Sequence, residues 1–155
     1  MDAIKSILKP GDVVLIEGQS RVSSAIQFIT NSNWSHAAIF IGKTDTCNHC
    51  LIEVKAVDGC RYTDIDVYMH HNLRICRPVF LNNRKRTVLI KYLIKKIGSK
   101  YDLKNIFDLI RFAYPNPPVP KKYRRNLIGI GAGDPTKAIC SSLIAEAFKE
   151  IQHPI

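Results

Sequence analysis

The sequence has no run of apolar residues that approaches the length needed to cross a bilayer, about 18. Its first ten residues carry charges throughout and lack the apolar core of a secretory signal. These absences predict a cytoplasmic protein, with signal-free export as the open alternative. At 155 residues the chain can bury a core without disulfides, and no internal repeat or linker divides it. We therefore predict a single domain over residues 1–155.

Acidic residues are scarce: 13 Asp and Glu face 23 Lys and Arg, which gives a net charge of +10. This excess favours anionic partners such as phospholipid head groups, nucleic acid or acidic proteins. Two basic clusters concentrate the charge, Arg84-Lys85-Arg86 and Lys121-Lys122-Tyr123-Arg124-Arg125. Because no nucleic-acid-binding motif accompanies them, we rank peripheral contact with an anionic membrane surface above nucleic acid. A simple solvated face is the alternative.

Cysteine is limited to five residues, an odd number that predicts reduced thiols rather than a disulfide framework. Cys47 and Cys50 form a C-x-x-C motif, and Cys60, His70 and His71 could add further zinc-type ligands. The motif has no second matching pair, however. We therefore predict neither a metal site nor a cofactor.

Residue patterns predict five strands and one helix in the first half of the chain and helices in the second. Period-two and short apolar runs indicate strands at 13–16, 36–41, 50–55, 61–67 and 73–78. Helical spacing indicates helices at 20–30, around Ile90–Ile97 and ending at Gly98, at 103–110, and from Cys140 to Ile151. A long loop spans 114–135. Short connections between the strands favour an antiparallel sheet, so the fold class is α+β, a small antiparallel sheet packed against helices.

Three residues in distinctive local settings could form a catalytic group. Cys140 begins the last amphipathic helix, where unpaired N–H groups and the helix dipole lower the pKa of a thiol. His36 opens an apolar strand, and Glu53 lies between Ile52 and Val54 in the next one. A thiol, an imidazole and a carboxylate are the parts of an oriented cysteine nucleophile. The alternatives are a core cysteine, a hydrogen-bonded histidine and an outward-facing glutamate.

The segments that carry these residues resemble the circularly permuted branch of the NlpC-type papain-like superfamily. They are Lys9-Pro10-Gly11-Asp12-Val13-Val14-Leu15, Ser35-His36-Ala37-Ala38-Ile39-Phe40-Ile41-Gly42, Ile52-Glu53-Val54 and Ile139-Cys140-Ser141-Ser142-Leu143-Ile144. The similarity is greatest to the YiiX-like members and more distant to lecithin:retinol acyltransferase-like enzymes. It implies a permuted papain-like fold in which Cys140 is the nucleophile, His36 the base and Glu53 the orienting residue. Gly98-Ser99-Lys100-Tyr101-Asp102 resembles the family's Gly-x-x-Tyr-Asp stretch, which implies that Tyr101 and Asp102 lie near the substrate.

The resulting hypothesis is a cysteine-nucleophile hydrolase or acyltransferase. It would act on an amide or ester bond of a small-molecule, peptide or lipid substrate through a thioester intermediate, without a cofactor. The alternative is a non-catalytic basic module that binds anionic lipid or nucleic acid, with Cys140 only a core residue.

Overall fold

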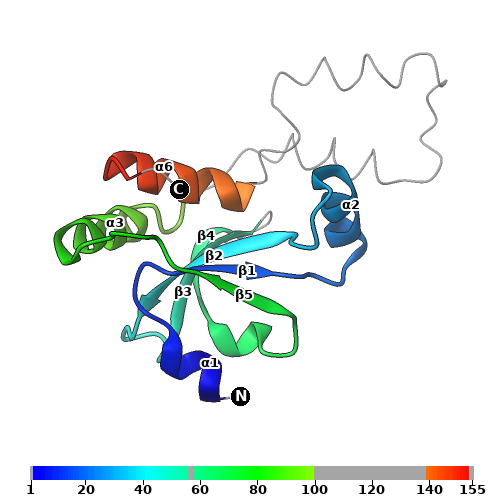
Figure 1. The fold of residues 1–155 in the computed structure, drawn as a ribbon, viewed down its shortest axis with the longest axis horizontal. Helices are drawn as coiled ribbons and strands as arrows, with labels where there is room; N and C mark the ends of the chain where they lie inside the picture. Colours follow the sequence, from blue (N-terminus) through cyan, green and yellow to red (C-terminus); the bar gives the residue numbers. More distant parts are fainter. Residues whose placement is uncertain (1, 56–57, 100–138, 154–155) are drawn as a thin grey trace, which may run out of the picture.

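The centre of the fold is a five-stranded sheet with the order β4-β3-β2-β1-β5 (Figure 1). The computed structural model describes residues 2–55, 58–99 and 139–153. Every strand pairing is antiparallel, which confirms the α+β prediction. The strands are β1 (Val13–Ile16), β2 (His36–Gly42), β3 (Cys50–Lys55), β4 (Gly59–Asp64) and β5 (Leu73–Cys76).

Helices cover both faces of the sheet. They are α1 (Asp2–Ile7), α2 (Arg21–Thr30), the 3-10 helix η1 (Ile65–Tyr68), α3 (Asn83–Lys95) and α6 (Ile139–Glu150). Helix α2 begins where the Ser20 side chain accepts a hydrogen bond from the backbone N–H of Ser23, and it ends at Asn31 in the left-handed conformation. Helices α3 and α6 lie together on one face, whereas α1 and η1 lie on the other (Figure 1).

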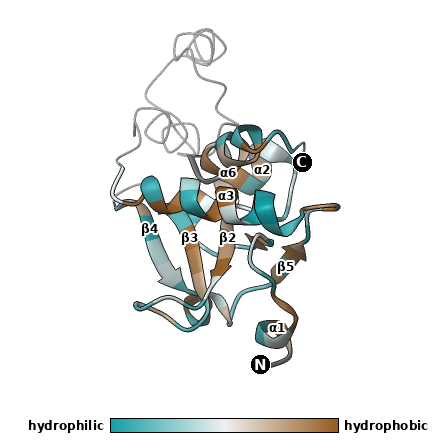
Figure 2. Ribbon diagram, turned by 90° about the vertical axis from the view of Figure 1, so that its left-hand side faces the viewer, coloured by the Kyte–Doolittle hydropathy of each residue, from teal (hydrophilic) through white to brown (hydrophobic). Residues whose placement is uncertain are grey.

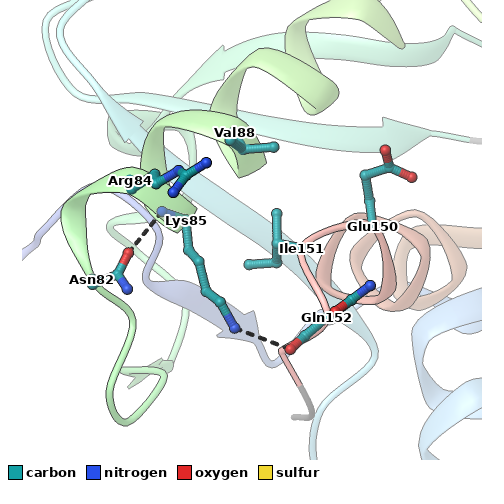
Figure 3. Close-up of a pocket in the computed structure, with 7 residues that line it drawn as sticks. All are labelled: Asn82, Arg84, Lys85, Val88, Glu150, Ile151 and Gln152. Carbon is teal, nitrogen blue, oxygen red and sulfur yellow. Dashed lines mark hydrogen bonds between the residues drawn. The ribbon is translucent and has the colours of Figure 1, made fainter.

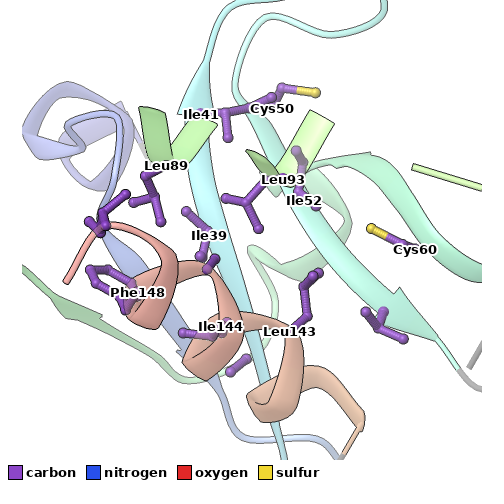
Figure 4. Packing of buried hydrophobic residues seen from close by; sticks show 14 of the residues in the cluster. Ile39, Ile41, Cys50, Ile52, Cys60, Leu89, Leu93, Leu143, Ile144 and Phe148 are labelled. Carbon is purple, nitrogen blue, oxygen red and sulfur yellow. The ribbon is translucent and has the colours of Figure 1, made fainter. Parts of the chain in front are cut away.

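The alternation of side chains along the strands builds two cores. Figure 2 shows the apolar segments of the central strands under the helices. On one face, Ile39 and Ile52 pack with Leu143 and Phe148 of α6 (Figure 4). On the other, Leu51 packs with Tyr68 and the rest of a smaller cluster. Because successive strand residues point to opposite faces, Glu53 belongs to the face of η1 and not to that of α6.

Several predicted boundaries differ from the structure. Helix α3 starts at Asn83, well before Ile90, because Asn82 caps it by accepting from the N–H of Lys85. Its fully buried residues are Leu89 and Leu93, while Ile94 is 43% exposed and so lies outside the buried stripe. The strand expected at 61–67 ends at Asp64 and gives way to η1, and α1 was not predicted. The helix expected at 103–110, the loop at 114–135 and the basic cluster at 121–125 lie outside the described residues.

The prediction of reduced thiols is wrong for Cys47 and Cys50, which form a disulfide. Cys47 lies in the connection between β2 and β3, and Cys50 is the first residue of β3. Within this connection the N–H of Thr44 donates to the carbonyl of Cys47 and turns the chain back. The turn brings the two Cα atoms to 5.3 Å, within the range that a disulfide can bridge. A chain reversal of this kind cannot be inferred from the cysteine count.

One connection contains an unusual backbone conformation. Residues 77–82 join β5 to α3, and within them Phe80 has a φ of 61°. The left-handed region costs a residue with a side chain about 1–2 kcal/mol, and glycine or asparagine usually occupies it. Phe80 is also 92% exposed, so packing within the fold does not compensate for this conformation.

Candidate active site

Glu53 is the most buried charged residue among those described, with 1% of its surface exposed. Its position in the middle of β3 directs the carboxylate into the core on the η1 face. Four side chains surround it. Arg61, its cross-strand neighbour on β4, donates from Nε to Oε1 at 3.0 Å, and Lys55 Nζ lies 3.8 Å from the same oxygen. Tyr68 donates its hydroxyl to Oε2.

His36 contacts the same carboxylate oxygen as Tyr68. Its Nε2 lies 2.7 Å from Oε2 of Glu53. As the first residue of β2, His36 stands at the end of the sheet, and 19% of its side chain is exposed. Because Nε2 is engaged by Glu53, Nδ1 is the ring nitrogen that would exchange a proton with a substrate or nucleophile. This is the orienting contact expected of a carboxylate behind a catalytic imidazole.

Burial by itself would raise the pKa of Glu53, because desolvation disfavours the charged form. The hydrogen bonds from His36 and Tyr68, together with the charges of His36 and Lys55, outweigh burial and lower the pKa from 4.5 to about 2. The carboxylate is therefore ionised throughout the physiological pH range. An ionised Glu53 fixes a proton on Nε2 of His36 and stabilises the imidazolium form.

Cys140 is the second residue of α6, in its first turn, as the sequence predicted. Beyond it the helix buries Leu143, Ile144, Ala147 and Phe148 against β2 and β3. In Figure 4 the start of α6 lies toward the end of β2 that is away from Ile41, which is the end where His36 stands. Figure 1 shows the same arrangement, with α6 starting near α2 and ending over α3. The side chain of Cys140, and the whole of Tyr101 and Asp102, lie outside the described residues.

Sequence reasoning missed Arg61 and Tyr68. A signal for Arg61 was present, because the Asp58-Gly59 turn closes a hairpin in which Glu53 pairs with Arg61. Tyr68 had no such signal, since it reaches the carboxylate from a 3-10 helix that follows β4 and is capped by Asp64. Arg61 also donates from Nη1 to Asp58 at 2.7 Å, which ties the hairpin turn to the site.

Comparison with known proteins assigns the family. The model of the family described as "Permuted papain-like amidase enzyme, YaeF/YiiX, C92 family" matches residues 7–114. The chain belongs to this permuted papain-like amidase family. The match contains His36 and Glu53 and ends before Cys140. It confirms the resemblance and the fold expected from the sequence motifs.

Two relatives of this amidase family extend the comparison. The chain is 23% identical to a protein of Escherichia coli strain K12 named "Probable lipoprotein peptidase YaeF", over 96% of this chain and 58% of the relative. The crystal structure of the "metalloprotein yiiX" of Escherichia coli O157:H7 superposes with a TM-score of 0.61 at 18% identity, covering 92% of this chain and 66% of that one. The chain thus spans less than two thirds of the length of either relative.

The described part of the chain contains no group of three or more His, Cys, Asp or Glu side chains placed to hold a metal ion. Cys47 and Cys50 are joined to each other, and the rings of His70 and His71 are tilted against each other with centroids 4.3 Å apart. In the disulfide, Cys47 and Cys50 offer no free thiolate for the zinc arrangement considered from the sequence. No helix within the described ranges is both long and apolar enough to cross a membrane.

Replacing Tyr68 by phenylalanine should destabilise the fold by about 2 kcal/mol, because the hydrogen bond ends on a buried charge. It should also raise the pKa of Glu53, since one of the groups that lower it is removed. Urea unfolding at several pH values measures both effects. Tyr62→Phe is the matched control, since its hydroxyl has no hydrogen bond among the described residues. If the two variants lost equal amounts of unfolding free energy, the role of the Tyr68 hydroxyl would be contradicted.

Proposed function

We propose that this chain is a cysteine hydrolase that cleaves an amide bond, with Cys140 as nucleophile, His36 as base and Glu53 as the residue that orients the base. The observation that carries the proposal is the 2.7 Å contact between Nε2 of His36 and the buried carboxylate of Glu53. This contact lies at the end of the sheet where helix α6 begins (Figure 4). Burying a carboxylate and an imidazole costs folding free energy, so core packing alone would not account for this pair.

The proposed reaction proceeds in two steps. Nδ1 of His36 takes the proton of the Cys140 thiol, and the thiolate attacks the carbonyl carbon. The tetrahedral intermediate collapses as the C–N bond breaks, and the amine leaves with the proton from Nδ1. Water then attacks the thioester while Nδ1 accepts its proton, and the thiol returns as the carboxylic acid departs. Glu53 stays ionised throughout and holds the Nε2 proton.

The start of α6 favours this chemistry in two ways. The first N–H groups of a helix have no partner within the helix, so the N–H of Cys140 can stabilise the oxyanion of the tetrahedral intermediate. The positive end of the helix dipole also lowers the pKa of a thiol at this position. We expect Tyr101 to be a second oxyanion donor. Tyr101 and Asp102 remain predicted substrate contacts.

An amide is the favoured substrate because the family is described as amidase and the YaeF relative is named a peptidase. A lipid or ester substrate, and transfer of the acyl group to an acceptor other than water, stay predictions from the sequence. The cytoplasmic location also stays a prediction from the sequence. The disulfide between Cys47 and Cys50 is more typical of an oxidising compartment.

Selective alkylation of Cys140 tests the proposal without knowledge of the substrate. In a Cys76→Ser background near pH 6, iodoacetamide should label Cys140 rapidly, and His36→Ala should slow the labelling about 10- to 100-fold. Cys60 is an internal reference, since burial raises its pKa to about 11. Cys47 and Cys50 are protected in their disulfide. Intact-mass measurement and peptide mapping give the rates. Labelling of Cys140 no faster than Cys60 would instead favour a non-catalytic binding module.

A further inference from the structure

The loop between β5 and α3 exposes two adjacent apolar side chains at its tip. Val79 is 67% exposed and Phe80 is 92% exposed, the largest value among the exposed large apolar residues of the described ranges. In Figure 2 this loop projects from the body of the protein as an apolar segment between β5 and α3. Phe80 has the left-handed backbone conformation described above, which glycine would adopt more readily. Neither core packing nor the turn accounts for phenylalanine here, and such outliers point to function.

Positive charge surrounds this apolar tip. The sequence from Leu73 to Arg86 contains five arginine and lysine residues and no aspartate or glutamate. Arg77 precedes the tip and is 46% exposed, although its guanidinium also binds Asp12. Arg74 and Arg84 are exposed and have no ion-pair partner in the described part of the chain. The combination of an apolar tip and a basic surround fits the interface of an anionic bilayer.

A shallow groove continues the basic surface between the start of α3 and the end of α6 (Figure 3). Arg84 and Lys85 line one wall, and Lys85 Nζ donates to the carbonyl of Gln152 at 3.1 Å. Glu150 is the acidic residue of the opposite wall, and in Figure 3 its carboxylate points away from Arg84. The groove therefore leaves the guanidinium of Arg84 available to a phosphate group at the edge of the apolar tip.

We propose that the Val79–Phe80 loop docks this protein onto a bilayer of anionic phospholipid. Phe80 and Val79 insert between the lipid head groups, and the flanking arginines bind lipid phosphates. The apolar pair favours a bilayer over nucleic acid, because nucleic acid offers no apolar phase for two adjacent exposed side chains. The proposal concerns a surface separate from the proposed active site and does not depend on hydrolase activity.

The strand register places the docking loop away from His36. Cys76 at the end of β5 lies opposite Val13, which pairs with Ile39 of β2. His36 stands three residues before Ile39, about 10 Å along the strand, and the chain leaves Cys76 in the other direction. A protein docked through Phe80 would therefore present the His36 end to the aqueous phase. This orientation suits a water-exposed amide better than a lipid acyl chain.

Vesicle sedimentation of the full chain tests the proposal. We expect binding to phosphatidylcholine vesicles that contain phosphatidylglycerol and none to phosphatidylcholine alone. Phe80→Gly should weaken binding about tenfold through lost apolar contact, and Arg84→Gln should weaken it about fivefold. Glycine suits the φ of 61° at this position, so the first variant should fold at least as well as the wild type.

Matched controls come from the same protein. Phe28→Ala removes an 81% exposed phenylalanine of α2, and Lys91→Gln removes one charge two turns along α3 from Arg84. Both should keep wild-type binding within about twofold. The proposal would be overturned if Phe80→Gly bound vesicles as well as the wild type, or if Phe28→Ala lost as much affinity as Phe80→Gly. It would also be overturned if the wild type did not bind anionic vesicles, or if it preferred polynucleotide to vesicles at the same salt concentration. The rate of Cys140 alkylation, measured in each variant, tests the proposed hydrolase function independently of vesicle binding.

Discussion

Alanine in place of Cys140 is expected to lower amide hydrolysis by at least about 10³-fold, because it removes the proposed nucleophile and leaves only substrate binding and oxyanion stabilisation. The variant should also fail to form a covalent acyl adduct with a p-nitrophenyl ester, which acylates an activated thiolate directly. The helix should persist, since alanine has a high helix propensity. The measurements are kcat/KM on fluorogenic peptidyl amides and the intact mass of the protein after mixing with the ester.

Cys76→Ser is the control for this substitution. Cys76 is a free cysteine at the end of β5, opposite Val13 and at the far end of the sheet from His36. Its replacement should leave the acyl adduct and the hydrolysis rate within about twofold of the wild type. If Cys140→Ala keeps the adduct while Cys76→Ser loses it, the nucleophile has been assigned to the wrong residue.

Local sequence patterns were sufficient for the central part of the fold. The strands at 13–16 and 50–55 have the predicted bounds, and β2 exceeds its predicted range by one residue. The hydrophobic content of these segments determines the strands, and the short connection between β2 and β3 favours their antiparallel pairing. The position of β5 beside β1 did not follow from the sequence, because it depends on η1 carrying the chain back across the sheet.

The candidate site divides in the same way. The pairing of His36 with Glu53 followed from the start of one strand and the middle of the next, and the structure brings the two side chains together. A buried carboxylate needs hydrogen-bond donors, so the inward orientation of Glu53 required donors that could not be identified from the sequence. Tyr68 and Arg61 are those donors, and Tyr68 lies one residue beyond the strand expected at 61–67, at the end of η1. Tertiary structure, not local pattern, selected them.

Replacing Glu53 by glutamine is the second change with a large expected effect. Lowering the pKa from 4.5 to about 2 corresponds to about 3 kcal/mol of folding free energy, since each pKa unit is worth about 1.4 kcal/mol. Because the folded-state pKa is depressed, this stabilisation is complete above pH 4.5 and is lost as the pH falls toward 2. Glutamine cannot carry the charge, so the variant should lose about 3 kcal/mol near neutral pH.

The pH dependence distinguishes this electrostatic effect from a packing defect. The difference in unfolding free energy between wild type and Glu53→Gln should shrink toward zero near pH 2, as measured by urea unfolding with Trp34 fluorescence. Asp58→Asn is the matched control: its carboxylate also binds Arg61 but is 47% exposed, so the loss should stay below about 1 kcal/mol. The same Glu53 variant should slow Cys140 labelling at pH 6, because His36 loses the charge that stabilises its protonated form. A difference that stays constant from neutral pH down to pH 2 would show that Glu53 acts through packing and not through its charge.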